Sequence, residues 1–215
     1  MESRFEAADA WLAERGLTRA DVQPLLVQPA DWLNAAQREL VYGFRHEFPD
    51  ATGEPLQKVI DEAQAESRTD DTPKKRPPGQ TGGSVSVARD TRDLSTPDRI
   101  YDGLALEYDG TPFSPREPVV AMRFRVDEAL PVHVPDQQLS ELAGRGPSHD
   151  PGYPYPFTGT GFTASDRFAV PEYFLPAGTP MNPGAEMYRI DPDGRERLVA
   201  VLNDEGEWTR VKPDG

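Results

Sequence analysis

Apolar residues recur at helical spacing through the N-terminal part of the chain. Four segments of this kind follow one another: residues 3–15, 19–27, 29–48 and 55–66. The third segment has the most regular apolar stripe, which consists of Trp32, Leu33, Ala36, Leu40, Val41 and Phe44. This spacing predicts a helical module over residues 1–67 and places Trp32 in its core.

Residues 68–83 interrupt the apolar pattern. This stretch is rich in Pro, Gly, Lys, Arg and Asp and contains no large apolar side chain. Such a stretch buries too little surface to offset the conformational entropy lost on ordering. We therefore expect a flexible linker here.

The pattern changes to a period of two after the linker, which is typical of strands. We expect strands at residues 84–90, 118–126, 130–134, 185–190, 195–202 and 207–211, with short helices at 97–106 and 135–144. Asp193-Gly194 and Glu205-Gly206 supply tight reversals between the last three strands, which predicts an antiparallel meander. The expected fold class is therefore α+β, with a β-rich domain over residues 84–215 that ends in this meander.

A Gly- and Pro-rich loop over residues 145–184 precedes the meander. Gly permits positive φ and Pro fixes φ near −65°, so this density of both residues constrains the path of the backbone. A polar, hydroxyl-rich run from Thr158 to Arg167 lies within the loop. We expect the loop to present this run for binding, or else to pack it through local hydroxyl-to-backbone hydrogen bonds.

Charge and composition narrow the possible partners. The net charge is −14 and the sequence pI is about 4.6, which disfavours nucleic acid and membrane surfaces and allows a basic partner such as a cognate inhibitor or chaperone. There is no Cys, and the three His are scattered, so we expect neither a thiol nucleophile nor a metal site. The sequence has no apolar run of membrane length and no signal-peptide pattern. We expect a soluble protein that is cytoplasmic, or exported without a classical signal peptide.

Four Arg residues precede the hydroxyl-rich loop in the sequence, and we expect them to lie beside it in the fold: Arg89, Arg92, Arg99 and Arg116. Guanidinium groups near Gly-rich backbone can hold a diphosphate through forked hydrogen bonds. The alternative is that these residues form surface ion pairs with the abundant Asp and Glu. For Glu172 the alternative is a solvated residue at the end of a strand.

Residues 98–117, DRIYDGLALEYDGTPFSPRE, followed by MRFRVDEALPVHV at 122–134, resemble NAD-glycohydrolase toxins of the tuberculosis necrotizing toxin type. In this resemblance Arg99 occupies the Asp-Arg position of the family. Tyr108 takes the place of the family Tyr, and Arg116 is the Arg that follows Gly-Thr-Pro-Phe.

A second resemblance concerns ADP-ribosyltransferases. VARDTRDLSTPDRIYD (87–102) is similar to their opening strand, and GFTASD (161–166) is similar to their Ser-Thr-Ser strand. EYFLPAGTP (172–180) is similar to the segment that carries their catalytic Glu. The arrangement of a helical module, a linker and a β-rich C-terminal domain also resembles the end of actinobacterial polymorphic secreted proteins, where a toxin domain closes the chain.

These resemblances imply an NAD-cleaving effector for which NAD is the substrate and no cofactor is permanently bound. Arg89 and Arg116 would hold the diphosphate, while nicotinamide-ribose would contact Phe162, Thr163 and Ser165. A carboxylate, Glu172 or else Glu107, would stabilise an oxocarbenium-like state, and Tyr108 and Arg99 would complete the catalytic set. The alternative is a non-enzymatic interaction module, such as an immunity or chaperone-like partner or a structural component of a secreted assembly.

Overall fold

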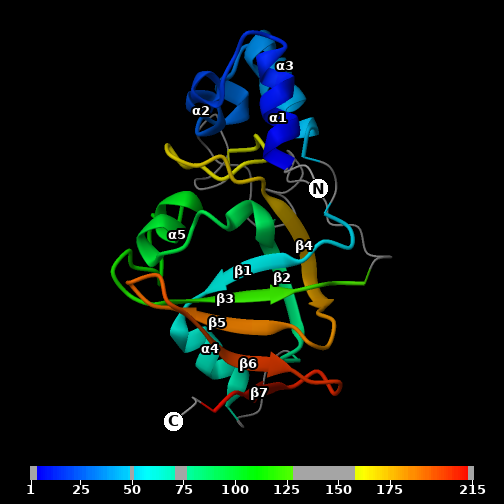
Figure 1. Cartoon of the computed structure of the whole chain (residues 1–215), viewed down its shortest axis with the longest axis vertical. Helices are drawn as coiled ribbons and strands as arrows, with labels where there is room; N and C mark the ends of the chain where they lie inside the picture. The colour runs from blue at the N-terminus through cyan, green and yellow to red at the C-terminus, as the bar shows by residue number, and fades with distance from the viewer. Residues whose placement is uncertain (1–3, 49–50, 71–76, 128–157, 213–215) are drawn as a thin grey trace. The chain divides into compact units, whose positions relative to one another are not determined.

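The computed structural model describes residues 4–48, 51–70, 77–127 and 158–212 (Figure 1). The chain divides into two compact units. The helical unit comprises residues 1–50, 101–111 and 134–173, and the sheet unit comprises residues 51–100, 112–133 and 174–215. Helices predominate near the N-terminus and strands near the C-terminus, which confirms the α+β class.

Three α-helices form most of the helical unit: α1 (Arg4–Ala13), α2 (Arg19–Leu26) and α3 (Ala35–His46). At the start of α2 the Thr18 amide donates to Asp21 Oδ2 at 2.8 Å, as a capping residue should. At the start of α3 the Asn34 side chain accepts from the Gln37 amide, and Gln37 Oε1 accepts from the Asn34 amide. Both caps satisfy amides that have no partner within the helix.

The prediction that Trp32 lies in the helical core is wrong. The capping box at Asn34 starts α3 at Ala35, two residues after Leu33 and so beyond Trp32. Residues Ala30–Trp32 form a separate 3₁₀ turn, η1, so Trp32 does not continue the stripe of α3. Its side chain is 61% exposed, whereas Val41 and Phe44 of the same predicted stripe are fully buried. Of the other predicted stripe residues, Leu33, Val41 and Phe44 are buried, Leu40 is half-buried and Ala36 is exposed, so the predicted stripe is correct only in part.

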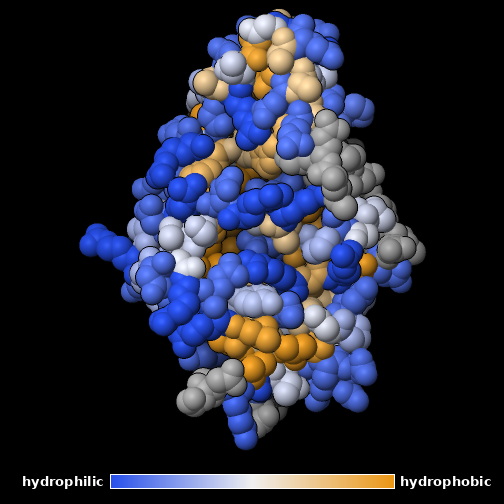
Figure 2. Space-filling view, viewed as in Figure 1, coloured by the Kyte–Doolittle hydropathy of each residue, from blue (hydrophilic) through white to orange (hydrophobic). Residues whose placement is uncertain are grey.

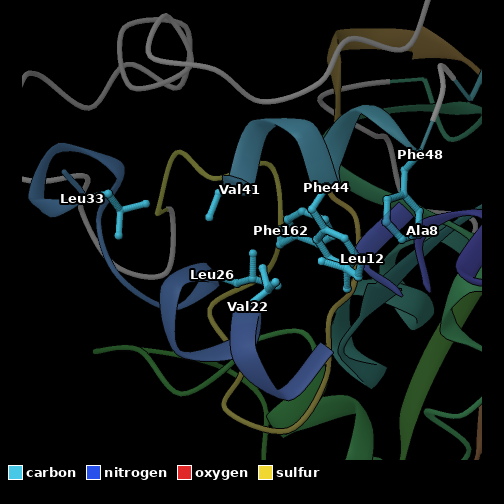
Figure 3. Packing of buried hydrophobic residues seen from close by; sticks show 9 residues of the cluster. All are labelled: Ala8, Leu12, Val22, Leu26, Leu33, Val41, Phe44, Phe48 and Phe162. Atoms are coloured by element: carbon cyan, nitrogen blue, oxygen red, sulfur yellow. The ribbon is translucent and has the colours of Figure 1, made fainter. Parts of the chain in front are cut away.

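The core of the helical unit includes a residue from far along the chain. It consists of Ala8, Leu12, Val22, Leu26, Leu33, Val41, Phe44, Phe48 and Phe162 (Figure 3). Phe162 lies among the side chains of α2 and α3, although the sequence assigned it to the β-rich domain. The three helices thus complete their core with a loop residue.

The helix predicted over residues 55–66 is wrong in its first half. Leu56–Ile60 forms strand β1, and helix α4 (Glu62–Thr69) begins only after Asp61, whose Oδ1 accepts from the Gln64 amide at 2.7 Å. The apolar residues of this short segment fit either period. Pairing with two neighbouring strands selects the extended form.

The sheet unit is built on seven strands, of which β4 begins with the last residue of the helical unit. The other six are β1, β2 (Gln80–Val87), β3 (Val119–Phe124), β5 (Glu186–Ile190), β6 (Glu196–Leu202) and β7 (Trp208–Arg210), and β4 spans Tyr173–Pro180. Their order is β4-β2-β1-β3-β5-β6-β7. Each residue of β1 from Leu56 to Ile60 pairs with one residue of β3, in antiparallel register. The 3₁₀ turn η2 (Ala88–Thr91) and helix α5 (Pro97–Gly103) follow β2.

The predicted meander of the last three strands is confirmed. Gly194 and Gly206 stand in the two reversals with φ of +83° and +78°, a conformation that side-chain-bearing residues rarely adopt. Trp208 is 6% exposed, and its indole Nε1 donates to the Pro78 carbonyl at 2.9 Å. This hydrogen bond ties β7 to the segment that leads into β2.

The strands predicted at 84–90 and 118–126 correspond to β2 and β3, and the helix predicted at 97–106 corresponds to α5. The strand at 130–134 and the helix at 135–144 lie outside the described residues. Only the ends of the predicted linker over 68–83 are described, where residues 68 and 69 close α4 and residues 80–83 open β2. Its flexibility stays a prediction. No helix among the described residues has the length and apolar character needed to cross a membrane.

Candidate functional site

The hydroxyl-rich loop folds as a small hairpin in the helical unit. Phe162 and Pro171 form an antiparallel bridge. The Thr163 amide donates to the Val170 carbonyl at 3.0 Å, and the Glu172 amide donates to the Gly161 carbonyl at 2.9 Å. These bonds place Phe162, Thr163 and Glu172 on adjacent arms of one turn.

Arg45 on α3 holds the hairpin through hydrogen bonds from its side chain. Its side chain is buried and donates to three carbonyls: Gly161 at 2.9 Å, Phe48 at 2.6 Å and Glu172 at 3.1 Å. Its guanidinium carbon also lies 4.7 Å from the ring centroid of Tyr173. The position follows Phe44 directly in sequence, and nothing in the helical pattern distinguishes it from an exposed Arg.

Gly161 allows this anchoring to take place. Its φ is +80°, and a Cβ built on it would lie 2.8 Å from Arg45 Nε and 2.9 Å from Arg45 Cδ. A larger residue would therefore both strain the backbone and displace the guanidinium.

The hydroxyl groups of the loop hydrogen-bond within the helical unit. Thr160 Oγ1 donates to the Leu26 carbonyl at 3.0 Å, and Thr163 Oγ1 donates to the Gly103 carbonyl at 2.6 Å. Ser165 Oγ accepts from the amides of Arg167 and Phe168 at 3.2 and 3.1 Å. Ser165 therefore shows the local hydroxyl-to-backbone alternative, whereas the hydroxyls of Thr160 and Thr163 bond to carbonyls far away in the sequence.

The remaining predicted site residues of the helical unit are Phe162, Glu172 and Tyr108. Phe162 is fully buried and stacks on Phe44. Glu172 is 7% exposed, and its carbonyl accepts from Arg45. Tyr108 is half-buried in the turn after α5, where its amide donates to the Leu106 carbonyl at 3.1 Å.

The predicted site Arg residues belong to the sheet unit. Arg89 Nη2 pairs with Glu54 Oε1 at 2.6 Å, which is the ion-pair alternative stated for it. Arg99 Nε donates to the Asp93 carbonyl at 2.5 Å, and Arg116 is exposed. The structure thus brings Phe162, Thr163, Ser165 and Glu172 into one hairpin, while Arg89, Arg99 and Arg116 lie in the other unit.

The sheet unit also carries a cluster of charges around the buried residue Asp191. Arg197 Nε reaches Asp191 Oδ2 at 3.1 Å, Arg195 Nη2 reaches the same oxygen at 3.4 Å, and Arg189 pairs with Oδ1. Burial raises the pKa of Asp191, but the hydrogen bond from Arg197 and the three positive charges outweigh it, so that the pKa lies below its usual value. The cluster fixes the β5–β6 reversal. Among the described residues no group of His, Asp and Glu is arranged to hold a metal ion.

Two large aromatic side chains stand on the surface of the helical unit. Trp32 in η1 is 61% exposed and Tyr42 on α3 is 52% exposed. The face of the sheet unit seen in Figure 2 carries a separate apolar patch over β5 and β6, which hydrophilic surface surrounds. These surfaces were not predicted from the sequence, because apolar side chains in a periodic pattern are expected in the core.

Comparison of the chain with protein-family models, with curated proteins and with solved structures found no match.

Proposed function

We propose that this protein is a non-enzymatic interaction module that binds a basic protein partner through the surface of its helical unit. The observation that carries the proposal is the exposure of Trp32 and Tyr42 on an acidic unit. Trp and Tyr are the residues most enriched among binding hot spots, because they bury a large area at a low cost in conformational entropy.

The excess of negative charge on the helical unit favours a basic partner. Asp and Glu outnumber Arg in the described part of the helical unit, and the whole chain carries a net charge of −14. A basic surface would therefore be attracted to this unit at long range, which raises the association rate. Lys or Arg of the partner can also lie over exposed aromatic rings.

The hydrogen bonds that the loop's hydroxyl groups make within the helical unit support the same proposal. The hydroxyls of Thr163 and Ser165 bond to backbone within the helical unit, and Phe162 fills its core. A bound nicotinamide-ribose would have to compete with these hydrogen bonds and with the packing of Phe162. The geometry of this hairpin favours a structural role for these three residues.

Affinity capture from a lysate of the source organism tests the proposal. We expect a protein of basic isoelectric point to be retained by the unmodified protein and lost with the Trp32→Ala/Tyr42→Ala double variant. The matched control is Val211→Ala, because Val211 is 39% exposed but lies in the sheet unit, and this variant should retain the partner. Equal capture by the double variant and the control, or capture of an acidic protein alone, would contradict the proposal.

NAD cleavage remains a second candidate, which the sequence resemblance motivates. One structural feature favours it, since Glu172 is a buried carboxyl residue beside the Gly-rich arm of the hairpin. Incubation of the purified protein with NAD and detection of free nicotinamide tests it directly. Release that Glu172→Gln abolishes without weakening NAD binding would establish the enzyme, and no release at millimolar NAD would leave the interaction module.

A further inference from the structure

A groove in the sheet unit runs between α4 and the strands that α4 packs against. Its volume is about 320 Å³, within the range of small-molecule sites. The side chains that line it are Glu62, Ala65, Glu66, Thr69, Val120, Met187, Arg189, Val199, Arg210 and Val211. They come from α4, from the four adjacent strands β3, β5, β6 and β7, and from the residue that follows β7.

The base of the groove is apolar. Val120 and Met187 are buried beneath it, while Val199 is half-buried and Val211 is 39% exposed. The Val211 amide donates to the Val199 carbonyl at 2.9 Å, which holds these two residues next to each other. Apolar surface on Val199 and Val211 is therefore available to a ligand.

Arg210 provides a positioned cation on this apolar surface. Its Nε donates to Thr69 Oγ1 at 3.0 Å. The Thr69 hydroxyl in turn lies 3.2 Å from each of the carbonyls of Ala65 and Glu66, one turn back on α4. A hydroxyl that donates to a carbonyl turns its lone pairs outward, so α4 fixes the direction of the guanidinium through Thr69.

Arg210 makes no ion pair within the described part of the protein, although Glu66 lines the same groove. Arg189, the other cation of the groove, pairs with Glu62 at 2.5 Å and with Asp191. The hydrogen bond to Thr69 is the one polar contact of the Arg210 side chain within residues 4–48, 51–70, 77–127 and 158–212. Its terminal N–H groups can therefore take an anion.

We propose that this groove binds a small amphipathic carboxylate, with the carboxylate on Arg210 and the apolar part on Val199 and Val211. A guanidinium can bind a carboxylate through two parallel hydrogen bonds, which adds geometric specificity to the attraction between the two charges. The same charge repels a cationic head group. Glu66, which also lines the groove, limits the affinity for an anion through like-charge repulsion.

Octanoate is the probe that tests this site. In methyl-resolved NMR we expect octanoate to shift the Val199 and Val211 signals, and octylamine to shift them much less at the same concentration. Arg210→Gln should weaken octanoate binding roughly 10-fold or more, since it removes a charge-assisted hydrogen bond. Glu66→Gln should strengthen binding.

The matched control is Arg116→Gln, because Arg116 is an exposed Arg of the same unit outside the groove. It should leave octanoate binding unchanged. Equal loss in the Arg210 and Arg116 variants would assign the effect to net charge and overturn the proposal. Equal binding of octylamine, or no shift with millimolar octanoate, would also overturn it. Arg210 is exposed, so its replacement leaves the fold intact, and unfolding curves of each variant check this.

Discussion

The ring of Phe162 stacks on the ring of Phe44, with 5.3 Å between the centroids and an angle of 17° between the planes. Phe48 meets the same Phe162 ring edge-on at 5.6 Å. Phe162 thus contacts two aromatic residues, Phe44 within α3 and Phe48 just after the end of α3. The N-terminal helices alone lack the residue on which both rings pack.

Truncation of Phe162 should therefore destabilise the helical unit. We expect Phe162→Ala to cost about 3–5 kcal/mol in free energy of unfolding, because a fully buried aromatic side chain leaves a cavity. Urea titration followed by far-UV circular dichroism measures the change. Tyr42→Ala is the control, since Tyr42 is 52% exposed in the same unit and should cost less than about 1 kcal/mol. Similar losses in the two variants would show that Phe162 is not a core residue.

Replacement of Arg45 tests how the hairpin is held. Arg45→Met keeps much of the side-chain volume but leaves the carbonyls of Phe48 and Glu172 without the Arg45 donor, while the Gly161 carbonyl keeps the Glu172 amide. Each buried acceptor without a partner costs about 1–3 kcal/mol, so we expect a loss of about 2 kcal/mol or more. The control is Arg38→Met, which removes an exposed Arg from the same helix and should change the free energy of unfolding little. If both variants unfold at the same urea concentration, the three hydrogen bonds do not stabilise the hairpin.

Gly43 on α3 should behave unlike an ordinary helical Gly. Gly→Ala inside a helix usually stabilises by up to about 1 kcal/mol. Here a Cβ on Gly43 would lie 2.4 Å from Cζ2 of Trp11, whose ring also lies under Arg15, with the guanidinium carbon 3.9 Å from its centroid. We therefore expect Gly43→Ala to lower the thermal midpoint of the unmodified protein. In a Trp11→Ala background the same substitution should raise it, because the ring is gone. An increase in both backgrounds would mean that Trp11 moves aside at no cost.

The fold could be predicted from the sequence where local signals and burial agree. The meander of β5, β6 and β7 has alternating strands and Gly at both reversals, so its prediction was correct. The segment at residues 56–60 was predicted as helix because five residues are too few to separate the two periods. Its strand form depends on pairing with β3, a contact between residues far apart in the chain.

The candidate site was harder to predict than the fold. Thr163 and Ser165 are residue types that bind ligands or cap backbone equally well, and the sequence does not say which carbonyl lies nearby. Phe162 was placed in a ligand site because the helical core that it completes is formed by residues between Ala8 and Phe48, far earlier in the chain. No sequence pattern marked Arg210 as a candidate binding residue, since the role proposed for it depends on its hydrogen bond to Thr69 and on the groove beside α4.

The charge cluster around Asp191 should make stability depend on pH in a defined direction. The pKa of Asp191 is lowered in the folded protein because Arg189, Arg195 and Arg197 outweigh its burial. A group with a lowered folded pKa contributes stability that is present above its unfolded pKa, about 3.9, and that is lost as pH falls through the folded value. Asp191→Asn should therefore lower the thermal midpoint at neutral pH, and the difference from the unmodified protein should shrink below about pH 4. The control is Asp193→Asn, because Asp193 is exposed in the same reversal and its Oδ1 accepts from the Arg195 amide, which Asn can also do. A difference between Asp191→Asn and the unmodified protein that stays constant from neutral to acid pH would show that the charge of Asp191 does not stabilise the fold.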